Sequence, residues 1–262
     1  MGISGREILA IANHKGGVGK TTIAHAIGAE LARRGRRVLL VDLDPQAALT
    51  AAASFTRGGI YLEDVIGGAL PGRAALVEVI RNLSPGLDLA PAGDNLAASE
   101  LGLVSRMGRE NVIARALATV AGSYDLMILD CPPSLGLLTV AGLVASSGVL
   151  VPVGARVADL RAAAVFLRTV DQIAAELRPG LEVIGLVPTF YDGRRRHDAE
   201  AIEAMRGGGL PVWDPVPASV KIAEAAASGV DAISYAGRDN PAAAALVKVT
   251  EGIEKWQSSG RQ

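Results

Sequence analysis

The stretch "HKGGVGKTT", residues 14–22, lies between an apolar run and a helical pattern. It follows the pattern G-x-x-x-x-G-K-[ST] of phosphate-binding loops, except that His14 stands where the leading glycine belongs and Lys15 comes directly behind it. The apolar run 7–13 predicts a strand, and the segment 19–34 predicts a helix. Because a Gly-rich loop between a strand and a helix turns backbone N–H groups toward an anion, this stretch predicts a phosphate-binding site.

The side chains of this loop have separate expected roles. Lys20 would contact the β- and γ-phosphates of a nucleotide, Thr21 would offer its hydroxyl to Mg²⁺, and Thr22 would bond the α-phosphate. A glycine-rich turn with an incidental lysine is the alternative, which the strand–loop–helix context disfavours. The expected nucleotide-binding residues of the loop are Lys15, Gly16, Gly17, Val18, Gly19, Lys20, Thr21 and Thr22.

Apolar runs alternate with helical patterns along the rest of the chain. The runs lack in/out alternation, which is typical of strands in a parallel sheet that is covered on both faces. We therefore predict an α/β fold of the P-loop NTPase type, with a doubly wound, mainly parallel sheet in a single domain over residues 1–262. The expected strands are 7–13, 37–44, 124–130, 148–153 and 182–190, and the expected helices are 19–34, 109–121, 136–146, 159–177, 197–206, 218–228 and 241–257.

Composition limits the classes of function. The 262 residues are 50% hydrophobic, contain no long uncharged apolar run, and begin with a segment too charged for a secretory signal, so we expect a cytoplasmic protein without a membrane span. The single cysteine excludes an internal disulfide and a multi-cysteine metal cage within one chain. With a net charge of −1 and 3% aromatic residues, any nucleic-acid binding would depend on a local basic patch.

Acidic residues end two of the expected strands. Asp130 closes the apolar run "YDLMILD", where P-loop enzymes place the carboxylate that holds Mg²⁺. Asp42 and Asp44 in "VDLDPQ" lie where the second strand ends. We expect Asp44 to position the attacking water and Asp42 to support the Mg²⁺ shell, although spacing alone leaves ordinary strand-end capping open.

Together, "KGGVGKTT", "VDLDPQ" and "YDLMILDCPPSLG" resemble the ParA/MinD family of deviant Walker ATPases, and the match is nearest to ParA-type partition ATPases. The resemblance implies a role for Lys15: it matches the signature lysine that reaches across an ATP-dependent homodimer to the partner's phosphates. It also implies that Asp44 activates the hydrolytic water and that Asp130 belongs to the Walker B segment. The implied catalytic residues are Lys15, Lys20 and Asp44, and the implied metal-binding residues are Thr21, Asp42 and Asp130.

The resemblance extends to the base and to DNA. "VPTFYDGR" and "VPASVK" match segments near the adenine in relatives, which implies base contacts by Pro188, Tyr191 and Pro217, although Ala218 replaces the usual arginine. ParA-type dimers bind DNA without sequence preference and are stimulated by a ParB-type centromere-binding protein. The DNA contacts expected here are Arg194, Arg195 and Lys221. Arg238 is a further basic residue, and we interpret "RRGRR" (33–37) as a solvated helix end.

Two other functions are open to a chain with these motifs. A MinD-like ATPase at a membrane surface would need an amphipathic C-terminal helix, whereas "ALVKVTEGIEKWQSSGRQ" is typical of a packed terminal helix, so we do not expect membrane binding. A ParA-like ATPase could also position another cellular cargo. An iron–sulfur reductase is excluded because a bridged cluster needs two cysteines from each subunit, and only Cys131 is present. The expected location is the cytoplasm, on the nucleoid.

Overall fold

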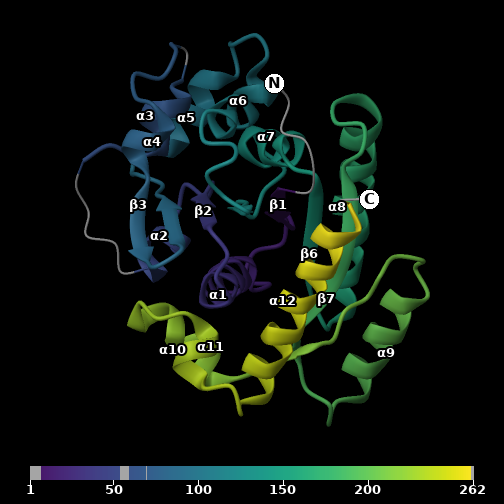
Figure 1. The fold of residues 1–262 in the computed structure, drawn as a ribbon. Coiled ribbons are helices and arrows are strands. Elements are labelled where there is room, and N and C mark those ends of the chain that lie inside the picture. The colour runs from purple at the N-terminus through teal and green to yellow at the C-terminus, as the bar shows by residue number, and fades with distance from the viewer. Residues whose placement is uncertain (1–6, 54–58, 69, 261–262) are drawn as a thin grey trace.

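A central sheet of eight strands organises the molecule (Figure 1), of which the computed structural model describes residues 7–53, 59–68 and 70–260. Its order is β3-β4-β2-β5-β1-β6-β7-β8, and all neighbours are parallel except the β3–β4 hairpin. The prediction of a doubly wound, mainly parallel sheet is thus confirmed. The strands are β1 (Ile8–Ile11), β2 (Val38–Asp42), β3 (Arg81–Ser84), β4 (Leu87–Ala90), β5 (Leu126–Asp130), β6 (Gly148–Gly154), β7 (Glu182–Tyr191) and β8 (Val216–Pro217).

Helices cover both faces of the sheet (Figure 1). One face packs against α1 (Lys20–Arg33), α2 (Ala48–Ala52), α10 (Val220–Ser228), α11 (Ala232–Ala236) and α12 (Pro241–Ser259). The other packs against α3 (Leu62–Ile66), α4 (Leu76–Val79), α5 (Leu96–Leu103), α6 (Val112–Ala118), α7 (Leu137–Ala145), α8 (Val157–Glu176) and α9 (Arg196–Arg206). A 3-10 turn, η1 (Arg109–Asn111), precedes α6.

Strand β1 shows why the apolar runs do not alternate. Ile8 and Ala10 belong to the core beneath α6, α7 and α8, whereas Leu9 and Ile11 belong to the core beneath α1 and α12. All four side chains are fully buried because each face of the strand meets a helical layer.

The elements that sequence patterns missed are the short ones. The β3–β4 hairpin, the two-residue strand β8, and the helices α2, α3, α4, α5 and α11 were not predicted. Most of these helices contain only four or five residues, which is too short for a helical period to be seen. They are stabilised by packing on the sheet rather than by their own propensity.

The topology brings three predicted segments together at the carboxyl ends of neighbouring central strands. Strands β1, β5 and β2 are adjacent and parallel, with Ile11 in register with Asp130 and Asp42 in register with Asp130. The sheet order changes direction at β1, which lies between β5 and β6. Open α/β sheets bind ligands at the carboxyl ends of strands near such a switch point.

Two findings concern the chain ends. In the part of the chain that the structure describes, no helix is both long and apolar enough to cross a membrane. Residues 1–6, on which the expectation of no secretory signal partly rests, and residues 261–262 of the C-terminal tail lie outside the described residues.

Candidate nucleotide-binding site

The loop between β1 and α1 has the backbone of a phosphate cradle. Gly17 and Gly19 adopt the left-handed region, with φ of 71° and 90°, which glycine reaches without steric cost. Gly19 is the N-cap of α1, and no side chain of the described residues caps this helix. The free N–H groups at the start of α1 therefore face the loop and suit an anion.

Asn13 anchors the loop to the sheet, although sequence patterns did not single it out. Its amide Nδ2 donates to the carbonyl of Pro152 at 2.8 Å, and its Oδ1 accepts from the backbone N–H of Lys15 at 3.0 Å. The side chain is fully buried. The available signal was a polar residue at the end of the apolar run 7–13, two residues beyond β1. His14 packs its ring against Phe166, with centroids 6.3 Å apart, which indicates a packing role.

Lys20 is a buried cation at the floor of the loop. Its Nζ donates to the carbonyl of Lys15 at 3.1 Å, and only 6% of the residue is exposed. Burial lowers the pKa of Lys20, while the neighbouring Asp130, Cys131 and Asp44 oppose that shift. Phosphate oxygens in the loop would restore the favourable partners that burial removes.

Lys15, in contrast, is held by its own chain. Its Nζ lies 3.1 Å from Oδ1 of Asp159, in the first turn of α8, with side-chain exposures of 42% and 11% respectively. Gly154 makes room for this carboxylate, since a Cβ at that position would clash with Oδ2 of Asp159. Lys15 therefore forms an intramolecular ion pair with Asp159.

Asp130 is a buried carboxylate at the end of β5. It is fully buried, and neither oxygen accepts a well-aligned hydrogen bond among the described residues, although the hydroxyl of Thr21 lies close enough to act on its pKa. Burial raises the pKa of Asp130 well above its ordinary value, and the charge of Asp42 raises it further; Thr21 and Lys20 oppose the rise. A buried carboxylate beside a threonine hydroxyl fits a divalent cation, so Asp130 and Thr21 could hold Mg²⁺.

Asp42 is occupied differently. Its Oδ2 accepts from the backbone N–H and the hydroxyl of Thr50, at 2.8 and 2.7 Å, and its Oδ1 accepts from the N–H of Asp44 at 3.1 Å. Burial raises the pKa of Asp42 to about 6, against these hydrogen bonds. The observed contacts make Asp42 a positioning residue for segment 43–50, and its predicted contact with the metal shell stays a prediction.

A cavity of about 390 Å³ opens beside the loop. Of the predicted residues, Gly17, Val18, Gly19, Lys20, Thr21, Thr22, Asp44 and Pro217 line it. Pro188 and Tyr191 are not among its lining residues; Thr189 and Phe190, which lie between them on β7, take that place. The base contacts expected of Pro188 and Tyr191 stay a prediction. The other lining residues, which were not predicted, are Ile23, Ala48, Pro133, Val216, Ser219, Ile222, Ala223 and Leu246.

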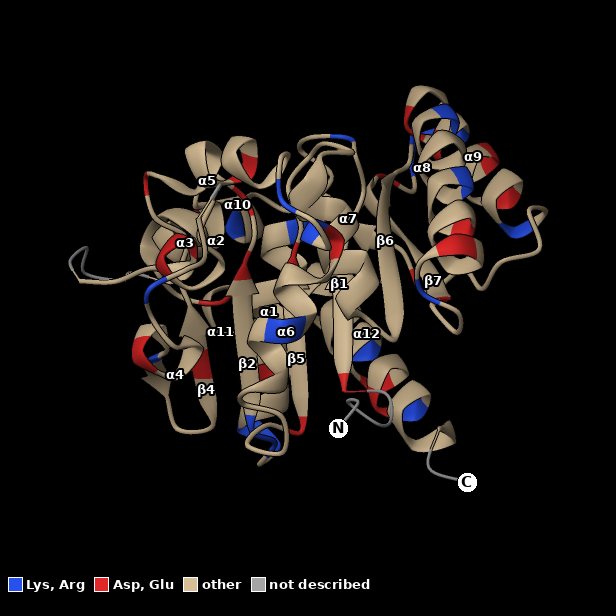
Figure 2. Cartoon of the chain, turned by 90° about the horizontal axis from the view of Figure 1, so that it is seen from above, with Lys and Arg blue, Asp and Glu red and all other residues tan. Residues whose placement is uncertain are grey.

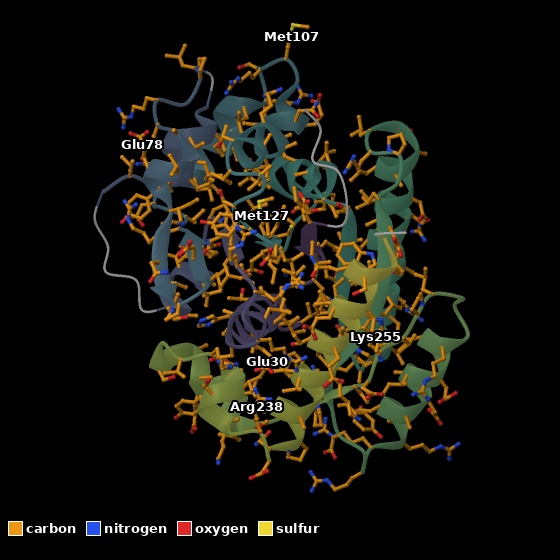
Figure 3. The ribbon with its side chains drawn as sticks, in the orientation of Figure 1. Glu30, Glu78, Met107, Met127, Arg238 and Lys255 are labelled. Atoms are coloured by element: carbon orange, nitrogen blue, oxygen red, sulfur yellow. The ribbon has the colours of Figure 1, made fainter. Side chains whose placement is uncertain are left out.

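The basic residues fall into two groups. The run 33–37, which was interpreted as a solvated helix end, instead forms ion pairs within the chain, for example Arg33 with Asp231 at 2.8 Å. Arg238, which the sequence left available for DNA, instead contacts Glu30 of α1 at 2.7 Å, and Figure 3 labels both residues.

The predicted DNA contacts are more exposed. Arg194 has a side-chain exposure of 91% and contacts Asp192 at 2.9 Å, and Arg195 contacts the same carboxylate at 3.5 Å. Lys221 is exposed on α10 and has no ion pair within the described residues. Basic and acidic residues alternate along α8 and α9 (Figure 2), so neither helix carries charge of one sign.

Comparisons with known proteins extend the similarity far beyond the loop. A protein-family profile described as an AAA domain matches residues 6–183. The sporulation initiation inhibitor protein Soj of Bacillus subtilis (strain 168) is 36% identical over 239 residues, which are 90% of this chain and 94% of that protein. The chromosome partitioning protein ParA of Caulobacter vibrioides is 35% identical over 235 residues, 87% of each.

A solved structure gives the same result in three dimensions. Cobyrinic acid a,c-diamide synthase from Mycobacterium smegmatis, with bound ADP and magnesium, has a TM-score of 0.84 to this chain at 34% identity. The match covers 98% of this chain and 97% of that one. The similarity therefore includes the whole sheet and both helical layers.

Proposed function

Because the chain belongs to the ParA/MinD family of P-loop ATPases, we propose that it is a ParA-type ATPase for plasmid or chromosome partition, with ATP and Mg²⁺ as cofactors. One observation carries the nucleotide-binding part: the uncapped start of α1 and the buried Lys20 line one cavity, and the buried carboxylate of Asp130 lies close enough to act on the charge of Lys20. An anion with a bound cation would satisfy all three groups.

Each group then has a defined task in ATP hydrolysis. The loop N–H groups and Lys20 bind the phosphates, while Thr21 and Asp130 would hold Mg²⁺, with Asp42 behind them. Mg²⁺, when bound, neutralises charge on the β- and γ-phosphates. Asp44 lines the same cavity, and its Oδ1 accepts from the N–H of Gln46 at 2.9 Å, which leaves Oδ2 to orient a water molecule.

The partition role also requires that the protein forms a dimer and binds DNA. We propose that ATP favours a homodimer in which Lys15 leaves Asp159 and contacts the partner's phosphates. The dimer would bind DNA without sequence preference through Arg194, Arg195 and Lys221, and doubling these contacts makes binding steeply salt-dependent. A ParB-type partner would stimulate hydrolysis and release the DNA. The similarity to Soj and to the Caulobacter ParA supports this role, which places the protein on the nucleoid in the cytoplasm.

The experiment that tests the proposed function measures DNA binding by gel shift and filter retention, with ATP, ADP or no nucleotide, over a salt series. Binding that requires ATP and weakens steeply with salt is expected. The matched variants are Lys221→Ala, which should weaken binding, and Lys248→Ala, an exposed lysine paired with Asp214, which should not. DNA binding that ignores the nucleotide would contradict the proposal.

A membrane role and a different cargo are the alternative functions, and the same binding assay distinguishes them from DNA partition. A MinD-like role would need a free amphipathic helix, but the apolar residues of α12, including Leu246, Ile253 and Trp256, are buried. ATP-dependent binding to anionic vesicles instead of DNA would favour that role. Binding to neither surface would favour a different cargo or an activity such as the amide synthesis named for the M. smegmatis protein.

A further inference from the structure

Large apolar side chains are exposed on α5 and in the turn that follows it. Of the seven leucine, valine and methionine side chains of the described chain that are more than half exposed, five lie between residues 70 and 107. Three of them are close together in sequence: Leu101 is 77% exposed, Val104 57% and Met107 95%. Figure 3 shows Met107 pointing away from the body of the molecule. Because soluble proteins rarely leave such clusters uncovered, this one indicates a surface that another molecule contacts.

Helix α5 is apolar on its exposed side as well as on its buried side. Leu96 and Leu103 are buried and belong to the core beneath α6 and α7, whereas Ala97 and Leu101 face solvent. A surface helix normally carries polar residues opposite its buried face, and a helix that is apolar all round is normally covered on every side. The composition of α5 therefore indicates that another molecule covers its solvent side in the functional protein.

The neighbouring segments hold α5 in place. Oε1 of Glu100 accepts from the backbone N–H of Leu138, in the first turn of α7, at 3.1 Å. Gly68 also lies against α5, since a Cβ at that position would be 3.6 Å from Cα of Ser99 and 3.7 Å from Cα of Gly102. A partner would therefore not have to order this helix, which reduces the entropic cost of binding.

Three arginines lie beside the apolar cluster, and in the part of the chain that the structure describes none of them has a carboxylate partner. Each donates to a backbone carbonyl instead: Arg106 to Ile66 at 2.8 Å, Arg109 to Val104 at 2.7 Å and Arg115 to Gly108 at 2.9 Å. Glu110, the acidic residue between them, accepts from the amide of Asn111 at 2.9 Å. Guanidinium groups fixed beside an apolar cluster are complementary to carboxylates that flank an apolar surface.

We infer that this surface is the docking site for an acidic amphipathic helix of a partner protein. We call it the α5 face, and it consists of Leu101, Val104 and Met107 with Arg106, Arg109 and Arg115. The apolar side of the partner helix would cover the three apolar residues, and its carboxylates would pair with the arginines. Methionine and arginine are both enriched at protein interfaces.

The charge of the α5 face selects this occupant over two others. A second copy of the same face would bring like charges together. A lipid surface, whose headgroups move freely, makes no use of guanidinium groups held in fixed positions. The inference goes beyond the proposed function and does not rest on it, since no residue of the α5 face is assigned to ATP, Mg²⁺ or DNA.

Two fluorescent peptides of about four helical turns test this inference. Both carry leucines along one side; the first carries glutamates beside the leucines, and the second carries lysines in the same positions. Binding to the nucleotide-free protein is measured by fluorescence anisotropy, so the result does not depend on ATP. The test variants are the double variant Leu101→Ser/Met107→Ser and the single variant Arg109→Glu. The matched controls are Val220→Ser, at a valine that is 75% exposed on α10, and Arg206→Glu, at an exposed arginine of α9.

We expect the glutamate peptide to bind the wild type, and the lysine peptide to bind it at least about tenfold more weakly. The double variant should lose about tenfold in affinity for the glutamate peptide, because it truncates apolar contacts at the centre of the interface. Arg109→Glu should also lose about tenfold, because attraction to the carboxylates becomes repulsion. Both controls should bind within about twofold of the wild type. Since the altered side chains are exposed, no melting temperature should fall.

Several results would overturn the inference. If the glutamate peptide does not bind, or if the lysine peptide binds as tightly, the α5 face does not select an acidic helix. If the double variant binds the glutamate peptide like the wild type, the peptide binds elsewhere.

Two other occupants have their own signatures. Sedimentation velocity that shows a nucleotide-free dimer of the wild type but not of the double variant would assign the α5 face to a second copy. Vesicles of phosphatidylglycerol and phosphatidylcholine that bind the wild type but not the double variant would assign it to lipid. A wild type that binds no ATP would refute the proposed function and leave this inference standing.

Discussion

Replacing Asp159 with asparagine should strengthen the ATP-dependent dimer. Lys15 can contact a partner's phosphates only after it leaves Asp159, whose Oδ1 is 3.1 Å away. Because the lysine side chain is 42% exposed, solvent screens the pair, and we assign it about 0.5 kcal/mol. A dimer breaks one such pair in each subunit, so the variant should gain about 1 kcal/mol, or about a fivefold lower dimer dissociation constant.

Sedimentation velocity over a concentration series with ATP measures this constant. The comparison is made in an Asp44→Ala background, in which ATP is expected to persist. Asp171→Asn is the control, since it removes an exposed carboxylate from the same helix, α8, and has no ion pair among the described residues. If Asp159→Asn dimerises no more tightly than the control, the ion pair with Lys15 does not restrain the dimer.

Three further predictions concern single groups. Asp130→Asn should abolish Mg²⁺-dependent hydrolysis, because a neutral amide replaces the carboxylate that would bind Mg²⁺, and it should not lower the free energy of unfolding of the nucleotide-free protein in urea, because burial already disfavours the charged form of Asp130. Although burial opposes ionisation, hydrogen bonds from Arg33 and Ser234 lower the pKa of Asp231. The stability that Asp231 contributes is therefore present in full above its unfolded pKa of about 3.9 and is lost as pH falls through the lower folded value. Asp231→Asn should cost about 1–3 kcal/mol at pH 7 and less in acid, by urea unfolding. Lys221→Ala should reduce the slope of log K against log salt for DNA by about 1 for each phosphate group that this lysine neutralises.

Each of these has a contradicting result. An Asp130→Asn protein that unfolds more easily than the wild type would show that the carboxylate has a stabilising partner. If the cost of Asp231→Asn does not change with pH, the charge of this residue does not stabilise the contact between α1 and α11. If the salt slope of Lys221→Ala equals that of the wild type, Lys221 on α10 does not contact DNA phosphates.

Sequence patterns were sufficient where one segment carries its own signal. The glycines and Lys20 define the loop, the continuously apolar strands define a sheet covered on both faces, and Asp130 follows from its place at a strand end. These features depend on local backbone requirements and on burial, which composition and spacing express directly.

The remaining features depend on contacts between distant segments. The pairing of Lys15 with Asp159 joins the loop after β1 to the start of α8, and no local pattern reports it. Sequence patterns did not predict that Thr189 and Phe190 line the cavity, because the irregular register of β7 arises from pairing with β8, a strand of two residues. Asp42 was expected near the metal, but whether its oxygens bind a metal shell or Thr50 is decided by how segment 43–50 folds back.

ATP-dependent dimerisation through Lys15 is most directly tested by sedimentation velocity of the wild type and Lys15→Ala, each in the Asp44→Ala background with ATP and Mg²⁺. We predict that the chain with Lys15 sediments as a dimer with ATP and as a monomer with ADP. The Lys15→Ala chain should stay monomeric while it still binds ATP. If Lys15→Ala dimerises like its parent, or if the parent stays monomeric with ATP bound, a lysine-dependent dimer switch is contradicted.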